Sequence, residues 1–340
     1  MSQWCHMLVV KLLGFSLSSL FALPSLAMQV TPDSFEHAGQ RLSGFLISAR
    51  EQEVVQRVAI MVHGDGAMPY DAHGYYRPIW NRLIKAGYTV FSWDKPGVGQ
   101  SEGQWLHQSM RDRQGEVESA MTHIKMRFSL DDHHLGLVGF SQAGWVVPFL
   151  AQQHQELCFA MGAGFALNWM QQSWYLTEQR MQLQGANQFE LAEAYERHVA
   201  EQAFLNRQPD YTEYLARQDE ASGVMSPERF QFVLLNYQAD ATEDYLGIAT
   251  PFLLLLGDHD LNVDVRHTYR TLSPFVEYSP NFQIQMVENA THSLLRHPRF
   301  STQDPGIWFW LRFSLNKERA FAVGVLDYIE QWVRDTSEHC

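Results

Sequence analysis

A serine interrupts the chain where a short apolar run gives way to a predicted helix, in the stretch Gly139-Phe140-Ser141-Gln142-Ala143. The residues two positions before and two positions after Ser141 are Gly139 and Ala143. Small residues at these positions permit the sharp strand-to-helix turn called a nucleophile elbow, which exposes the serine hydroxyl to a substrate. The alternative is an ordinary crossover in which the serine only caps the helix. The motif alone leaves both interpretations open.

A carboxylate and an imidazole follow two later apolar runs. Asp260 comes after the run 251–256, and His292 comes after the run 282–287. The order Ser141, Asp260, His292 is the one expected for a catalytic triad built at the ends of parallel strands. In such a triad, His292 takes the serine proton and Asp260 holds the imidazole in the right tautomer. The order therefore favours nucleophilic catalysis by Ser141.

Two other carboxylates compete with Asp260 for the acid role. Asp258 lies directly after Gly257, where a turn residue is expected, and Asp264 precedes a predicted helix, where a capping residue is expected. Asp260 is favoured because the chain has turned back toward the site by that position.

An oxyanion hole requires two backbone N–H donors aimed at the developing charge. The N–H of Gln142, directly after the serine, is the first candidate. The second is expected from the loop after the apolar run 58–62, from Asp65 or Gly64. The Asp65 carboxylate is expected to point away from the oxyanion, and His63 to brace the loop.

The segment 94–103 is rich in glycine but does not match a nucleotide-binding loop. It lacks the Gly-x-x-x-x-Gly-Lys of a P-loop, and Glu102 stands where a dinucleotide fingerprint needs its third glycine. It is predicted to be a structural loop.

Apolar runs alternate with helical patterns through most of the chain. This alternation predicts the α/β class, with a mostly parallel central sheet flanked by helices. It lapses over 167–247, which is helical in character and is predicted to form a cap inserted between the two parts of the core, 28–166 and 248–340. The runs that predict the central strands are 58–62, 88–93, 134–140, 157–165, 251–256 and 282–287.

The first 27 residues resemble a secretory signal. Lys11 precedes an apolar stretch, 12–22, and small residues precede the expected cleavage after Ala27. Export to the periplasm or the medium is predicted, with an uncleaved anchor as the alternative. Two cysteines remain after cleavage, too few for a disulfide framework, and Cys158 is interpreted as a small core residue.

The composition limits the partners. The formal net charge is −13 and the isoelectric point about 5.5, without a basic cluster. This argues against nucleic acid and against electrostatic binding to anionic membranes. A small ester or amide is the expected partner, with no stable membrane insertion after signal cleavage. No metal or organic cofactor is required, and the oligomeric state is left open.

These motifs together resemble the α/β-hydrolase superfamily, in particular its bacterial serine esterase and peptidase-like branch, over about 35–335. The resemblance implies acyl transfer through an acyl-enzyme, with a carboxylesterase as the first hypothesis. A peptidase for short peptides and a non-catalytic binding protein are the alternatives. Pro148 departs from the pattern and is expected to kink the helix after the nucleophile. Aromatic residues are candidates for an acyl pocket, with packing of the cap onto the body as the alternative role: Trp169, Trp174, Tyr175, Trp308, Phe309 and Trp310, together with Met170.

Overall fold

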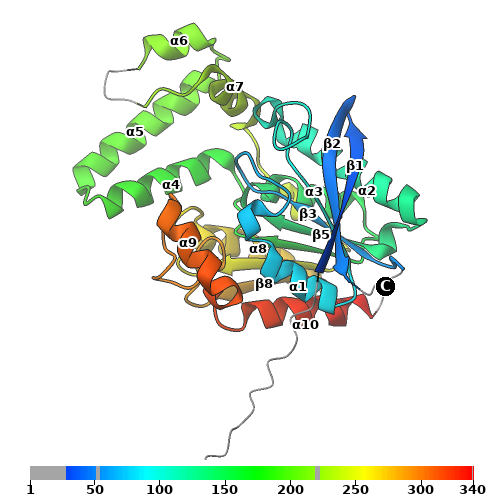
Figure 1. Ribbon diagram of the computed structural model, residues 1–340. Helices are drawn as coiled ribbons and strands as arrows, with labels where there is room; N and C mark the ends of the chain where they lie inside the picture. Colours follow the sequence, from blue (N-terminus) through cyan, green and yellow to red (C-terminus); the bar gives the residue numbers. More distant parts are fainter. Residues whose placement is uncertain (1–27, 51–53, 219–222, 339) are drawn as a thin grey trace, which may run out of the picture.

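The computed structural model describes residues 28–50, 54–218, 223–338 and 340. Its centre is one eight-stranded sheet in the order β1-β2-β4-β3-β5-β6-β7-β8 (Figure 1). An antiparallel hairpin of β1 and β2 forms one edge, and the other six strands, β3 to β8, run parallel to one another. The predicted α/β class with a mostly parallel sheet is confirmed. The predicted signal sequence, 1–27, lies outside the described residues.

The central strands form where the apolar runs predict them, because a strand covered on both faces needs apolar side chains in both directions. Every residue of β3, β4, β5, β6 and β7 is buried. Edge strand β8 instead is buried only at its two ends, and exposed and half-buried residues alternate between them. The bounds are β1 Met28–His37, β2 Gln40–Ala49, β3 Val58–Val62, β4 Thr89–Trp93, β5 Leu135–Phe140, β6 Phe159–Ala163, β7 Phe252–Gly257 and β8 Phe282–Val287.

Helices cover both faces of the sheet and enclose two apolar cores. On one face, α1 (Arg77–Lys85) packs beside α10 (Val325–Ser337). On the other face lie α2 (Met110–Phe128), α3 (Val147–Gln153) and α8 (Val265–Tyr278). A further helix, α9 (Ile307–Asn316), follows β8. Within the described ranges, no helix has the length and apolar character needed to cross a bilayer.

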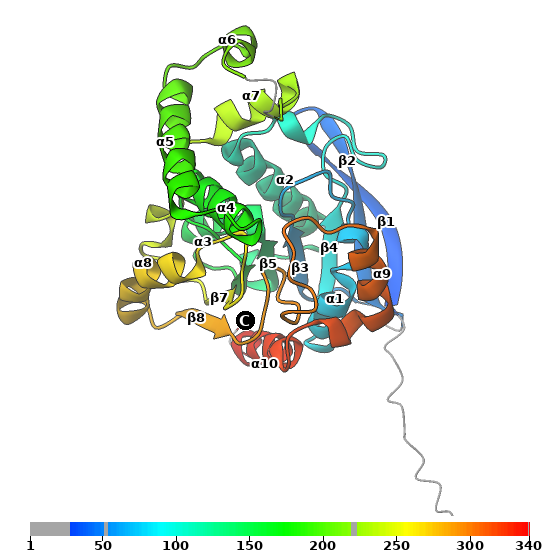
Figure 2. The same ribbon diagram turned by 90° about the vertical axis from the view of Figure 1, so that its left-hand side faces the viewer.

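Among the described residues, four α-helices lie between β6 and β7, in the segment that lacks the strand rhythm. They are α4 (Trp169–Leu183), α5 (Gln188–Leu205), α6 (Tyr211–Ala216) and α7 (Pro227–Asn236). In both ribbon views, α5 and α6 stand clear of the body (Figures 1 and 2). The two ends of the segment meet, because an antiparallel bridge joins Asn168 to Asp240. The segment therefore leaves the sheet and returns to it at one place.

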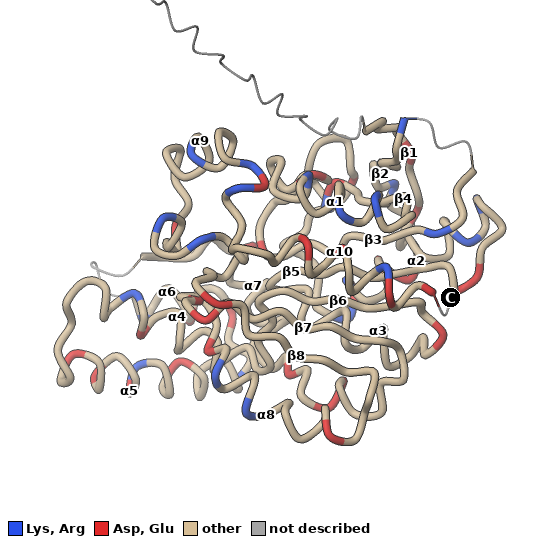
Figure 3. The backbone as a smooth tube through the Cα atoms, turned by 90° about the horizontal axis from the view of Figure 1, so that it is seen from below, with Lys and Arg blue, Asp and Glu red and all other residues tan. Residues whose placement is uncertain are grey.

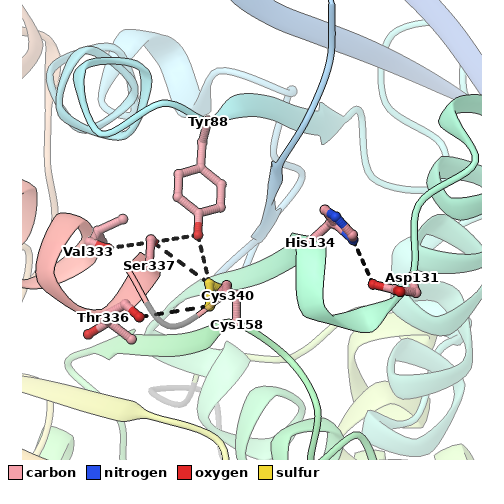
Figure 4. The surroundings of a disulfide bond; sticks show 8 residues. All are labelled: Tyr88, Asp131, His134, Cys158, Val333, Thr336, Ser337 and Cys340. Carbon is pink, nitrogen blue, oxygen red and sulfur yellow. Dashed lines mark hydrogen bonds and ion pairs between the residues drawn. A yellow bond between two sulfur atoms is a disulfide. The ribbon is translucent and has the colours of Figure 1, made fainter.

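A disulfide joins Cys158 to Cys340, across a sequence separation of 182 residues (Figure 4). The interpretation of Cys158 as only a small core residue is therefore wrong. Cys158 is buried, but it lies just before β6, where α10 brings the end of the chain within reach. The hydroxyl of Tyr88 lies 3.0 Å from the Cys158 sulfur and 2.6 Å from the Ser337 hydroxyl. The bridge thus fastens α10 to the sheet.

Candidate active site

The serine turn follows directly from the end of β5. Ser141 has φ of +51°, a left-handed conformation that costs energy for a residue with a side chain. Small neighbours make the turn possible: a Cβ at Gly139 would lie 2.9 Å from the Cβ of Ala143 and 2.7 Å from a Val147 methyl group. The chain can therefore reverse sharply and leave the Ser141 hydroxyl at the carboxyl edge of the sheet.

Pro148 does not kink a continuous helix, contrary to expectation. The residues after the turn form a short 3-10 helix, Ser141–Trp145, and Val146 then leaves helical geometry. Pro148 lies in the first turn of the new helix α3, a position where its missing N–H costs little. The proline begins a second helix instead of bending the first.

The structure brings Ser141, His292 and Asp260 into one chain of hydrogen bonds. The His292 Nε2 atom lies 2.9 Å from the Ser141 hydroxyl, and its Nδ1 atom lies 2.7 Å from Asp260 Oδ2. Both contacts are satisfied when Nδ1–H donates to the carboxylate and Nε2 accepts from the hydroxyl. Residues 151 positions apart in the sequence thus meet at one sheet edge.

Packing around the imidazole explains its position and its charge preference. A Cβ at Gly164 would lie 2.9 Å from the His292 ring, so only glycine lets the ring lie here. Burial disfavours the charged imidazole, but the adjacent Asp260 carboxylate outweighs burial and raises the pKa of His292. Asp260 therefore stabilises the imidazolium that would form when His292 takes a proton.

The two competing carboxylates have structural partners instead. Asp258 accepts a hydrogen bond from the Ala290 N–H at 3.1 Å. Asp264 caps α8 and accepts from the His267 N–H at 2.9 Å. Neither contact involves the imidazole of His292.

The oxyanion candidates lie around the serine. A Cβ at Gly64 would be 3.3 Å from the Cβ of Ser141, so the loop after β3 comes very close to the nucleophile. Asp65, Ser141 and Gln142 line one cavity. In the described part of the chain, the backbone N–H groups of Gly64, Asp65 and Gln142 donate no hydrogen bond to protein. They are available to a ligand.

Buried cations hold the β3 loop from behind, a feature that sequence reasoning missed. The Lys95 ammonium donates to the Gly64 carbonyl at 3.1 Å, and Arg113 donates to the His63 carbonyl and, at 2.7 Å, to the Gln142 side chain. Burial, with the charge of Arg113, lowers the pKa of Lys95 well below its usual value. The sequence indicates this role only through a lysine, Lys95, in the predicted structural loop 94–103.

His63 braces the same loop from the sheet. Its Nε2 lies 2.6 Å from the Trp93 carbonyl, and its Nδ1 lies 3.1 Å from the Tyr76 hydroxyl. Burial lowers the pKa of His63 to about 3, so the ring is neutral. A neutral ring with Nε2 protonated donates to the carbonyl and accepts from the tyrosine, which fixes the start of the loop.

The cavity beside Ser141 has a volume of about 300 Å³. Trp169 and Met170 line it, whereas Trp174 and Tyr175 line a neighbouring cavity of about 500 Å³. Trp308, Phe309 and Trp310 lie on α9 and line neither cavity. Their expected role in an acyl pocket is therefore not supported, because α9 packs against the core on the α1 and α10 side of the sheet.

The segment between β6 and β7 adds charged groups to the site cavity. The Arg229 guanidinium of α7 lies 3.3 Å from the Asp65 carboxylate, which also accepts from the Gln142 side-chain amide at 3.1 Å. Burial opposes the Asp65 charge, but Arg229 and Lys95 outweigh it and lower the pKa of Asp65. Glu201 of α5 lines the same cavity, and burial raises its pKa. No local sequence pattern marks these residues.

The eight-stranded sheet, with a serine on a tight turn after its central strand β5, defines the α/β-hydrolase class. Within that class, residues 54–299 match the family described as serine aminopeptidase, S33. The match covers more than half of the chain, and the protein belongs to this family.

Solved structures agree on the fold. A proline iminopeptidase from Mycobacterium smegmatis is 17% identical, with a TM-score of 0.55 over 91% of this chain and 99% of that one. An esterase from Pyrococcus furiosus is 14% identical, with a TM-score of 0.55 over 91% and 94%. The α/β hydrolase GrgF from Penicillium sp. sh18 is 14% identical, with a TM-score of 0.54 over 91% and 99%. No curated protein matches the chain by sequence.

Proposed function

We propose that this protein is a serine hydrolase that cleaves carboxylic esters through an acyl-enzyme on Ser141. The observation that carries the proposal is the hydrogen-bonded chain from Ser141 through His292 to Asp260. A hydroxyl is a poor nucleophile unless a neighbouring base removes its proton, and the imidazole lies within reach of that proton. The family and the fold support hydrolase chemistry.

In the proposed reaction, the Ser141 hydroxyl oxygen attacks the ester carbonyl while its proton passes to His292 Nε2. The N–H groups of Gln142 and of Asp65 or Gly64 stabilise the tetrahedral oxyanion. His292 then gives the proton to the departing alkoxide, which leaves the acyl group on Ser141. Water, activated by the same imidazole, attacks the acyl-enzyme and releases the acid.

Labelling with a fluorophosphonate tests the proposal, because this probe phosphonylates only an activated serine. We expect purified protein to be modified at Ser141, as mapped by peptide mass spectrometry, and Ser141→Ala to remain unlabelled. Ser173 lines the same cavity, so Ser173→Ala is the matched control variant and should be labelled like the wild type. Absence of labelling in folded protein, or labelling that survives in Ser141→Ala, would refute the assignment.

A peptidase acting on short peptides is the second candidate, and Glu201 is the observation that favours it. A peptidase that acts at the amino end of a peptide needs a carboxylate near the nucleophile to bind the terminal ammonium group. Glu201 lines the Ser141 cavity and could supply it. Parallel assays on p-nitrophenyl esters and on amino-acid 4-nitroanilides decide between the two. A Glu201→Gln variant that loses anilide turnover but keeps ester turnover would favour the peptidase.

We also propose that the protein is exported and that 167–247 acts as a cap over the site. The disulfide between Cys158 and Cys340 supports export, because disulfides persist in oxidising compartments. Cap residues that line the Ser141 cavity, such as Trp169 and Arg229, support the second point. Fractionation of cells and mass spectrometry of the N-terminus test export. Protein that begins at Met1 and is found in the cytoplasmic fraction would contradict it.

A further inference from the structure

Helix α9 has an apolar face that no other part of the described chain covers. Ile307, Trp308, Leu311 and Leu315 are 80, 75, 49 and 79% exposed. At 100° per residue, these four side chains fall within one arc of about 100°. Phe313, the helix residue buried in the core, points to the opposite side. The helix is thus apolar on its outer face as well as its inner one.

Exposed apolar side chains also occur on α5, at Phe189, Tyr195 and Val199, but α9 carries four of them within one arc. A helix that is apolar all round is typical of a buried or membrane-associated position. A patch of this kind marks a contact surface, because water-facing helices normally carry polar groups there.

The surroundings of α9 are basic, although the chain is acidic overall. The segment 296–319 holds five basic residues and two acidic ones, against a net charge of −13 for the whole chain. Arg299, Arg312, Lys317 and Arg319 are exposed, and in the described part of the chain none of them forms an ion pair. Figure 3 shows basic positions around α9, whereas α5 carries mainly acidic ones. This corner therefore fits an anionic surface.

The described chain begins beside the same helix. Met28 lines a cavity of about 920 Å³ together with Phe313 and Ser314 of α9 and with Lys317, which follows the helix. The 27 preceding residues include the apolar stretch 12–22. The expected signal segment therefore joins the described chain near the carboxyl end of α9.

We propose that the outer face of α9 is a peripheral docking surface for an anionic phospholipid bilayer. Trp308 and its apolar neighbours would enter the boundary between headgroups and acyl chains, and the basic residues would contact lipid phosphates. The net charge of the chain predicts no attraction to such a membrane, but the segment 296–319 is locally basic. The surface lies outside the Ser141 cavity, so the inference does not depend on the proposed hydrolase function.

Vesicle co-sedimentation tests the docking surface. The protein is purified from cells, its N-terminus is defined by mass spectrometry, and it is mixed with vesicles of phosphatidylcholine containing phosphatidylglycerol or of phosphatidylcholine alone. We expect binding to the anionic vesicles, weakened by salt. We expect the double variant Trp308→Ser/Leu311→Ser to partition about tenfold more weakly or worse, since it removes two large apolar groups from the contact.

The matched control removes two exposed apolar side chains from the proposed cap, Phe189→Ser/Leu183→Ser, which are 70 and 66% exposed in the wild type. This control should bind like the wild type. All four substitutions are on the surface, and thermal melting verifies folding. Binding that persists in the α9 variant would overturn the proposal and assign the membrane contact to the N-terminal segment. No vesicle binding, or a dimer in sedimentation velocity that the α9 variant dissolves, would also overturn it.

Discussion

Replacing Asp260 by asparagine exchanges one carboxylate oxygen for an NH2 group. The hydrogen bonds of Asp260 determine which of the two oxygens is replaced. Oδ1 of Asp260 accepts from the backbone N–H groups of Asn262 at 2.7 Å and Val263 at 2.9 Å. Oδ2 accepts from His292 Nδ1. An asparagine must keep its oxygen at the Oδ1 position, because the reverse orientation would aim its NH2 group at two backbone donors and cost at least about 2 kcal/mol.

The NH2 group of the asparagine therefore faces His292. It can donate only to an unprotonated Nδ1, which places the imidazole proton on Nε2. An Nε2 that carries a proton cannot accept one from Ser141, so the base is blocked by its tautomer while the geometry is retained. We expect kcat to fall about 10⁴-fold, as for the wrong tautomer in other serine triads, and Ser141→Ala to cost more, about 10⁶-fold.

The assay compares ester turnover and the rate of fluorophosphonate labelling for Asp260→Asn, with Asp258→Asn and Asp264→Asn as matched controls. Asparagine can still accept from the Ala290 N–H at position 258 and can still cap a helix at position 264. Both controls should therefore stay within about threefold of wild type. Turnover of Asp260→Asn within about tenfold of wild type, in protein with an unchanged melting curve, would contradict the assignment of Asp260 as the acid.

Three other changes should have distinct effects. Lys95→Met removes the donor to the Gly64 carbonyl and should lower kcat about 10- to 100-fold with KM little changed. The surface variant Lys85→Met is the control, and an equal loss of kcat in it would contradict a positioning role for Lys95. Because Asp260 raises the pKa of His292, and only neutral imidazole is a base, kcat/KM should fall as the pH drops, with its midpoint above the ordinary value of 6.5; a midpoint below 6.5 would count against this base. Cys340→Ser opens a loop of 182 residues and should destabilise the fold by about 3–5 kcal/mol, seen as a melting temperature about 5–15 °C lower; an unchanged melting temperature in non-reducing buffer would contradict the bridge.

The sheet and its central strands could be anticipated because buried parallel strands must be apolar in both directions. That requirement leaves continuous runs such as 58–62 and 251–256, which the structure shows as β3 and β7. The positions of Asp260 and His292 follow from the same logic, since residues after parallel strands meet at one edge. The sequence alone therefore indicates these candidate residues.

Long-range pairings could not be anticipated in this way. Nothing near Cys158 indicates that a cysteine 182 residues away lies beside it, because that contact depends on where α10 packs. The contact of Arg229 with Asp65 depends likewise on how α7 docks. The expected kink at Pro148 failed for a local reason: the 3-10 turn after Ser141 ends before the proline, which then lies at the start of a new helix.

The position of Asp65 links the proposed cap to the proposed oxyanion hole. Its backbone N–H is a candidate donor, while its carboxylate contacts Arg229 of α7 and the side chain of Gln142, whose own N–H is the other donor. A movement of α7 would therefore pull on the loop that carries one donor and on the residue that carries the other. Lys95 and Arg113 resist that pull from the core side. A substrate that enters the cavity must fit between the β3 loop, which Lys95 and Arg113 hold, and α7, whose Arg229 pairs with Asp65. We therefore expect substrate selectivity to depend on the α7 side of the cavity and turnover on its core side.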